Sequence, residues 1–122
     1  LSNGPIMISQ YYEGIANNKW LEITNISNTT IPENTYYLAL YRNEDANNTI
    51  NNKPSRNKII PAILPGETLK YSSTLPATLP TYAINNNEIK TSVCSFTGND
   101  IIILSTTNDE TCWANKVDIV GN

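Results

Sequence analysis

The amino-acid sequence predicts an all-β domain, a β-sandwich of about seven to nine short strands. No segment of ten residues or more places apolar side chains at helical spacing, whereas short apolar or alternating runs recur with turn residues between them. Asparagine is unusually frequent, with nineteen residues, and its side chain favours turns over helices. Short strands separated by such turns in 122 residues are typical of a sandwich.

Three strands are expected in the first third of the chain. Residues 6–12 form an apolar and aromatic run, and residues 36–42 are rich in the aromatic and aliphatic side chains that pack well on a sheet. Residues 20–25 alternate between apolar and polar side chains, which places Leu21 and Ile23 on one face of a strand.

The middle of the chain alternates between polar stretches and short strands. Residues 43–58 and 74–90 are expected to be long loops or insertions, since they are polar or contain prolines without a clear pattern. Short strands are expected at residues 58–60 and 69–73. The proline–glycine pair at residues 65–66 indicates a type II turn between them.

Three further strands are expected to close the chain, at residues 92–96, 101–104 and 116–120. Turn residues separate them, at positions 98–100 and 108–110. The run Ile-Ile-Ile-Leu at residues 101–104 is apolar on both faces, which favours a central strand.

Length and charge limit the classes of function. The chain fits one domain, residues 1–122, and its ends indicate a module from a longer, multidomain protein. A net charge of −3 with eight scattered basic residues argues against nucleic-acid binding. No apolar run approaches the roughly 18 residues that a membrane-spanning helix needs, so membrane insertion is not expected.

The two cysteines allow one disulfide bond between Cys94 and Cys112, which would indicate an oxidising compartment. The alternative is a pair of unbridged thiols, one of them buried beside Phe96.

Two segments near the start of the chain and one at its end form a recognisable pattern. Residues 8–14 read Ile-Ser-Gln-Tyr-Tyr-Glu-Gly, and residues 17–25 read Asn-Asn-Lys-Trp-Leu-Glu-Ile-Thr-Asn. The closing pattern is the turn and apolar strand at residues 96–104, followed by Val-Asp-Ile-Val-Gly at residues 117–121. Together these segments resemble the lamin tail domain family as it occurs in bacterial extracellular proteins. The proline–glycine turn also lies where the family has one. The match covers about 45 residues, and Gln10 and Thr24 depart from the family pattern.

The resemblance implies an immunoglobulin-like sandwich that serves as an accessory module on secreted or cell-surface proteins, beside nucleases, phosphoesterases or other hydrolases. Its motif positions are expected to be structural: Glu13, Gly14, Asn18, Glu22, Asn25, Gly98, Asp100, Asp118 and Gly121. Glu13 and Asp100 are expected to accept backbone hydrogen bonds in turns. Glu22 and Asp118 are expected on exposed strand faces, paired with Lys19 or Lys116.

The residues offer no complete set of catalytic groups. The chain has no histidine, which removes the commonest general base and metal ligand, and two cysteines do not complete a zinc site. We therefore expect no enzyme activity, no metal site and no cofactor. The expected partner is another protein or an extracellular component, together with other domains of the same chain.

Two other kinds of binding remain open. Tyr37, Tyr41 and Trp113 are the candidates for an aromatic binding surface, because such rings combine apolar area with a polar tip. A calcium- or carbohydrate-binding sandwich is thus one alternative. The other is a structural module that pairs with a second chain through an exposed edge strand.

Overall fold

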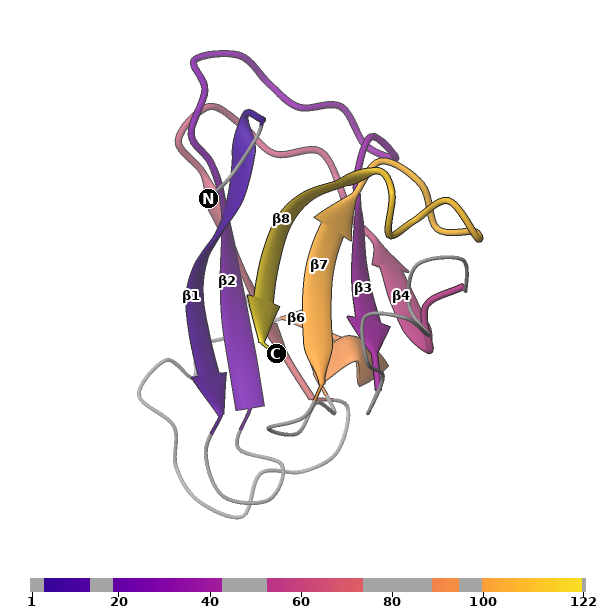
Figure 1. Ribbon diagram of the computed structural model, residues 1–122. Helices are drawn as coiled ribbons and strands as arrows, with labels where there is room; N and C mark the ends of the chain where they lie inside the picture. Colours follow the sequence, from indigo (N-terminus) through magenta and orange to yellow (C-terminus); the bar gives the residue numbers. More distant parts are fainter. Residues whose placement is uncertain (1–3, 14–18, 43–52, 74–88, 95–99, 122) are drawn as a thin grey trace.

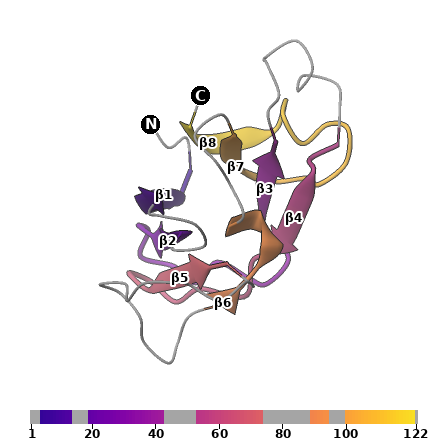
Figure 2. The same cartoon turned by 90° about the horizontal axis from the view of Figure 1, so that it is seen from below.

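The computed structural model describes residues 4–13, 19–42, 53–73, 89–94 and 100–121 (Figure 1). In this part of the chain, strands dominate and two four-stranded sheets pack face to face (Figure 2). The predicted all-β sandwich is confirmed. No helix of the described residues has the length and apolar character needed to cross a membrane.

Each sheet combines strands from distant parts of the chain. The first sheet has the order β1-β2-β5-β6, with β1 at Ile6–Glu13, β2 at Lys19–Asn25, β5 at Thr68–Ser72 and β6 at Ile89–Lys90. The second has the order β4-β3-β7-β8, with β4 at Arg56–Ile59, β3 at Tyr37–Tyr41, β7 at Ile101–Ser105 and β8 at Lys116–Gly121.

This strand order is immunoglobulin-like. The strands β1, β2 and β5 occupy the places of strands A, B and E, while β4, β3, β7 and β8 occupy those of C′, C, F and G. All of these neighbours are antiparallel, and β6 adds a short parallel pair to β5.

The main core lies between the sheets and follows the period of two along each strand. Leu21 and Ile23 of β2 face Leu38 and Leu40 of β3, and all four are fully buried. The alternate side chains of β3 face outward, and there Ala39 joins a second apolar cluster beneath the β7–β8 connection. Strand β7 therefore has apolar cover on both faces, which confirms its expected central place.

Seven of the eight expected strands are present, within two residues at their ends. The strand expected at residues 92–96 is wrong, because Ser92–Cys94 form a 3-10 helix, η1. Thr91 causes the turn: its hydroxyl accepts the Val93 amide and its carbonyl accepts the Cys94 amide, each at 3.2 Å. Consecutive residues 93 and 94 then both point into the core, which a half-buried strand does not allow.

The two expected insertions fall mostly outside the described residues. Positions 43–52 and 74–88 are not described, whereas β4 begins at Arg56 and β6 at Ile89, inside the stretches expected to be loops. The proline–glycine turn is confirmed: Gly66 has a φ of 75°, and the Glu67 amide donates to the Leu64 carbonyl at 3.0 Å.

Candidate functional site

Asp118 joins the edges of the two sheets where β1 and β8 lie close together (Figure 2). Its Oδ2 accepts the backbone amide of Ile8 at 2.7 Å, and its Oδ1 accepts the amide of Ile119 at 2.9 Å. The expected exposed position is wrong, since Asp118 is only 7% exposed.

The backbone of β1 explains why the carboxylate is needed there. The Ile26 amide donates to the Pro5 carbonyl, so by alternation the Ile8 amide points away from β2. The pairing then shifts between Ile8 and Gln10, which marks a β-bulge at Ser9. Asp118 satisfies the outward amide and closes this edge to other strands.

Glu22 belongs to a polar ladder on the outer face of the first sheet. The hydroxyl of the bulged Ser9 donates to Glu22 Oε1 at 2.8 Å and lies 2.7 Å from the Thr24 hydroxyl. Thr24 in turn lies 3.1 Å from the hydroxyl of Thr68 on β5. The expected outward position of Glu22 is confirmed, and its described partner is a serine on β1.

Asn25 is fully buried and holds three segments of the chain together. Its side-chain amide donates to the carbonyls of Thr29, Ile63 and Leu64 at 2.8, 3.0 and 3.2 Å. Its Oδ1 accepts the backbone amide of Ser27 at 2.9 Å and the Ser27 hydroxyl at 2.7 Å. These hydrogen bonds link β2 to the two segments at residues 27–29 and 63–64.

The last described strand requires glycine at its end. Gly121 has a φ of 96°, and a Cβ there would collide with the backbone carbonyl oxygen of Asp100. Asp100 itself is 3% exposed, beside the paired residues Ile101 and Gly121. Gly121 therefore belongs to the close β7–β8 pairing, and Asp100 directly precedes it on the β7 side.

The remaining motif positions carry little chemistry. The sequence predicts that Glu13 accepts backbone hydrogen bonds in a turn. It instead lies exposed at the end of β1, where it accepts a hydrogen bond from the hydroxyl of Tyr11 at 3.1 Å. Burial, followed by that hydrogen bond, raises the pKa of Tyr11 to about 12. Gly14, Asn18 and Gly98 lie outside the described residues.

The disulfide expected between Cys94 and Cys112 is wrong. Cys94 is buried in the core between the sheets, whereas Cys112 is buried in the outer cluster with Ala39 and Tyr41. The β4-β3-β7-β8 sheet therefore separates the two thiols in the folded chain. Burial raises the pKa of the Cys112 thiol, which lowers its reactivity further.

A thiol count tests this arrangement. We expect neither cysteine to react with iodoacetamide in the native protein within minutes, because both side chains are fully buried. In guanidinium chloride without reductant, both are expected to react, which mass spectrometry would record as two added groups. A chain that takes up label in guanidinium only after reduction would instead contain a disulfide.

The expected aromatic surface is wrong at Tyr41, which is 1% exposed. Trp113 covers it edge-on, with ring centroids 5.6 Å apart. One face of the Trp113 ring is in turn covered by the Lys116 ammonium, 4.3 Å from the centroid, and a planar ligand could not stack there. Tyr37 is partly exposed on the same strand, beside Ile59 of β4.

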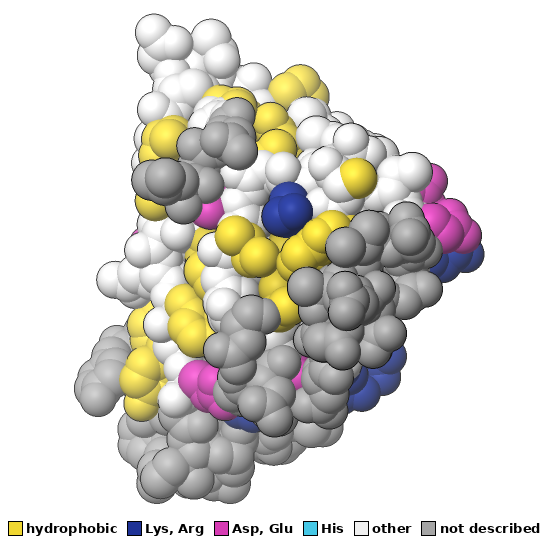
Figure 3. Space-filling view, viewed as in Figure 1, with side chains coloured by type: hydrophobic (Ala, Val, Ile, Leu, Met, Phe, Trp, Pro, Cys, Tyr) yellow, Lys and Arg dark blue, Asp and Glu magenta, His cyan; other side chains and the backbone are white. Residues whose placement is uncertain are grey.

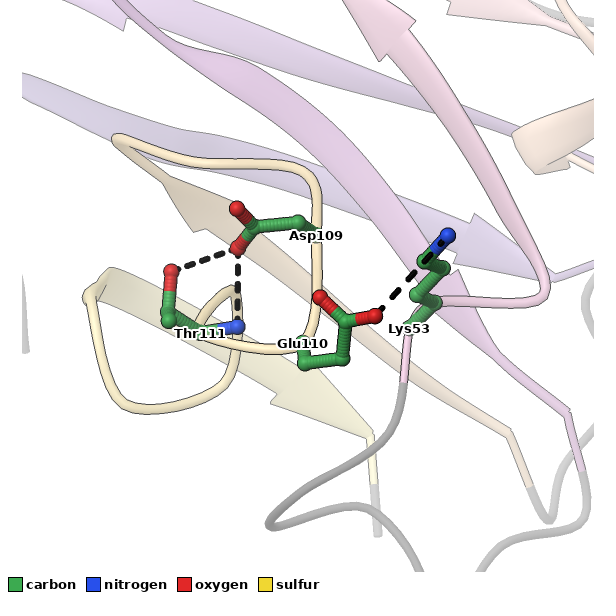
Figure 4. A network of polar contacts seen from close by, with 4 residues as sticks. All are labelled: Lys53, Asp109, Glu110 and Thr111. Carbon is green, nitrogen blue, oxygen red and sulfur yellow. Dashed lines mark hydrogen bonds and ion pairs between the residues drawn. The ribbon is translucent and has the colours of Figure 1, made fainter.

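The β7–β8 connection, residues 106–115, is held by its own polar contacts (Figure 4). Asp109 accepts the amide and hydroxyl of Thr111 at 2.8 and 2.6 Å, and these bonds lower the pKa of its carboxyl group. Lys53 and Glu110 approach to 3.9 Å, but both side chains are well exposed, so this ion pair contributes little. The expected turn at residues 108–110 is confirmed within a longer loop.

Most carboxylates described above therefore act within the fold. In the described residues, no three histidine, cysteine or acidic side chains gather as a metal site would require. Sequence reasoning missed the roles of Ser9 and Thr91. It expected a short strand at residues 58–60 but not that β4 forms a sheet edge, although Arg56 and Lys58 in a short strand are a pattern typical of edges.

Comparison of the chain with protein-family models gives no match, and comparison with curated protein sequences gives none.

Proposed function

We propose that the chain is a non-catalytic accessory module of the lamin-tail type in a larger secreted or cell-surface bacterial protein. There it would serve adhesion, docking or spacing beside a hydrolase-type domain. The proposal is supported by the motif segments and by the immunoglobulin-like order of the sheets. Fold alone does not assign function, so the roles of individual side chains matter more.

The observation that carries the proposal is how the acidic side chains are used. Asp118 binds the backbone of β1, Glu22 binds Ser9, and Asp109 binds its own loop. A general acid or base must be free to reach a substrate proton, whereas each of these carboxylates accepts a hydrogen bond that stabilises the fold. This use favours binding or spacing over chemistry.

The location rests on the resemblance, because unbridged thiols do not require an oxidising compartment. The partner is accordingly an extracellular component or another domain of the same protein. Carbohydrate binding on the expected aromatic surface is less favoured, since Tyr41 is buried and Lys116 covers a face of Trp113.

Deletion of residues 1–122 from the full-length protein tests this role. We expect the turnover number of the neighbouring catalytic domain on a small soluble substrate to change less than twofold, because the module supplies no reacting group. Retention of the protein on cells, or its rate on the native macromolecular substrate, is expected to fall at least fivefold. Loss of turnover on the small substrate, or unchanged retention and native rate, would contradict the proposal.

A further inference from the structure

Strand β4 is an open edge of the second sheet. The Ile60 amide donates to the Tyr36 carbonyl at 3.0 Å, and hydrogen-bonded pairs alternate along an antiparallel ladder. The amide and carbonyl groups of Asn57 and Ile59 therefore point away from β3. Within the described part of the chain these groups have no partner, and β4 forms the outer rim of the sheet (Figure 1).

The opposite rim of the same sheet is closed in a different way. There, Asp118 of β8 binds the outward amide of Ile8 on β1. An unpaired row of backbone groups is a template for another strand, and only a second extended chain satisfies its donors and acceptors together. The geometry of β4 thus selects an extended segment and not a helix or a small ligand.

The side chains of β4 divide between the two faces. Ile59 is 47% exposed on the outer face and lies opposite the partly exposed Tyr37. Arg56 and Lys58 lie on the other face, in register with Leu40 and Leu38. A strand added at this rim would therefore place alternate side chains against an apolar position and against two cations.

The rim is basic although the whole chain carries a net charge of −3. In the space-filling view, Lys and Arg side chains appear on the right, the side on which β4 lies in Figure 1, next to Asp and Glu side chains, and others lie elsewhere on this face (Figure 3). Pairing β4 with β4 of a second copy would bring Arg56 and Lys58 of both copies together. Like charges across neighbouring strands are destabilising, and edge cations are a known protection against self-association.

We propose that β4 binds an extended acidic segment of a partner protein, which adds a fifth strand beside Asn57 and Ile59. Acidic residues two positions apart in that segment lie against Arg56 and Lys58, and an apolar residue next to the one at Lys58, on the side away from Arg56, lies against Ile59. The inference names the partner class for the interaction role proposed above and rests on that role.

The probe for this surface is a blocked nine-residue peptide in which glutamate alternates with valine. We expect it to bind the whole 122-residue chain, measured by fluorescence anisotropy, and to shift the NMR amide signals of Asn57 and Ile59 first. The same peptide with lysine in place of glutamate is expected to bind at least tenfold more weakly. Equal binding of the two peptides would overturn the proposal.

A matched pair of variants isolates the backbone contact. Asn57→Pro removes only an outward amide, so we expect the fold to survive and the affinity to fall at least tenfold. Asn57→Ala keeps that amide and should change the affinity less than twofold. If the proline variant does not fold, N-methylation of alternate amides in the probe peptide removes the same kind of backbone hydrogen bond from the peptide's side. We expect that change to weaken the affinity at least tenfold.

Charge reversal and self-association complete the test. Arg56→Glu combined with Lys58→Glu is expected to reverse the preference, so that the lysine peptide binds more tightly. A different outcome is that the unmodified chain dimerises and does not bind the peptide. If Asn57→Pro abolished that dimer, the occupant of the β4 edge would be a second copy of the chain and not an acidic partner. If the peptide binds but the domain deletion has no effect, only the proposed function is contradicted. If the deletion has its expected effect but the peptide does not bind, only the edge proposal is contradicted.

Discussion

Replacement of Asn25 by aspartate is expected to lower the free energy of unfolding by about 3–5 kcal/mol. The two side chains have nearly the same shape, so packing is unchanged. The side-chain amide of Asn25 donates to the carbonyls of Thr29, Ile63 and Leu64, and a carboxylate would place an oxygen there instead. The position is fully buried, so solvent cannot screen the repulsion between these oxygens.

Urea unfolding followed by tryptophan fluorescence measures this loss. Asn28→Asp is the control, because the same chemical change at an exposed position is expected to alter stability by about 0.5 kcal/mol or less. A further comparison is Ser27→Ala, which removes one hydroxyl from the same network and should cost about 1 kcal/mol. If Asn25→Asp cost no more than the control, the three donated bonds would not stabilise the fold.

Removal of the carboxylate in Asp118→Ala is expected to cost about 3 kcal/mol. Two charge-assisted hydrogen bonds are lost, and the Ile8 amide is left buried between two sheets without its acceptor. The effect should concentrate where β1 meets β8, so hydrogen exchange of the Ile8 amide is expected to accelerate more than that of the Leu38 amide in the core.

Glu110→Ala is the matched control for Asp118. Glu110 is also acidic, but its side chain is 63% exposed and its ion pair with Lys53 spans 3.9 Å, so we expect a change within about 0.5 kcal/mol. An Asp118→Ala variant as stable as the Glu110→Ala variant would show that the bond to β1 adds nothing. Uniform acceleration of exchange at Ile8 and Leu38 would show global unfolding in place of local opening.

The strands were predictable where side chains alternate or form a continuous apolar run. Leu21 and Ile23 mark the buried face of β2, and residues 101–104 mark a strand covered on both sides. The strand expected around Cys94 failed because the hydrogen bonds of Thr91 wind the chain locally, and an apolar pair such as Val93-Cys94 fits a buried turn equally well. Short apolar runs do not distinguish these two structures.

The structural roles of the motif residues were only partly predictable. A polar residue in an alternating strand normally faces solvent, and Glu22 follows that rule. Asp118 breaks it, because a distant strand presents an unpaired amide at its position. The proposed disulfide failed for the same reason, since two cysteines 18 residues apart can lie on opposite faces of one sheet.

By itself, the sequence determined the all-β class, the approximate strands and the absence of histidine chemistry, because these depend on residue type and local spacing. The tertiary structure alone decided which edges are closed and which polar side chains are buried. Those properties arise from contacts between segments far apart in the chain, such as Ile8 with Asp118 and Asn25 with Ile63. The open rim at β4 is likewise visible only once the order of the strands is known.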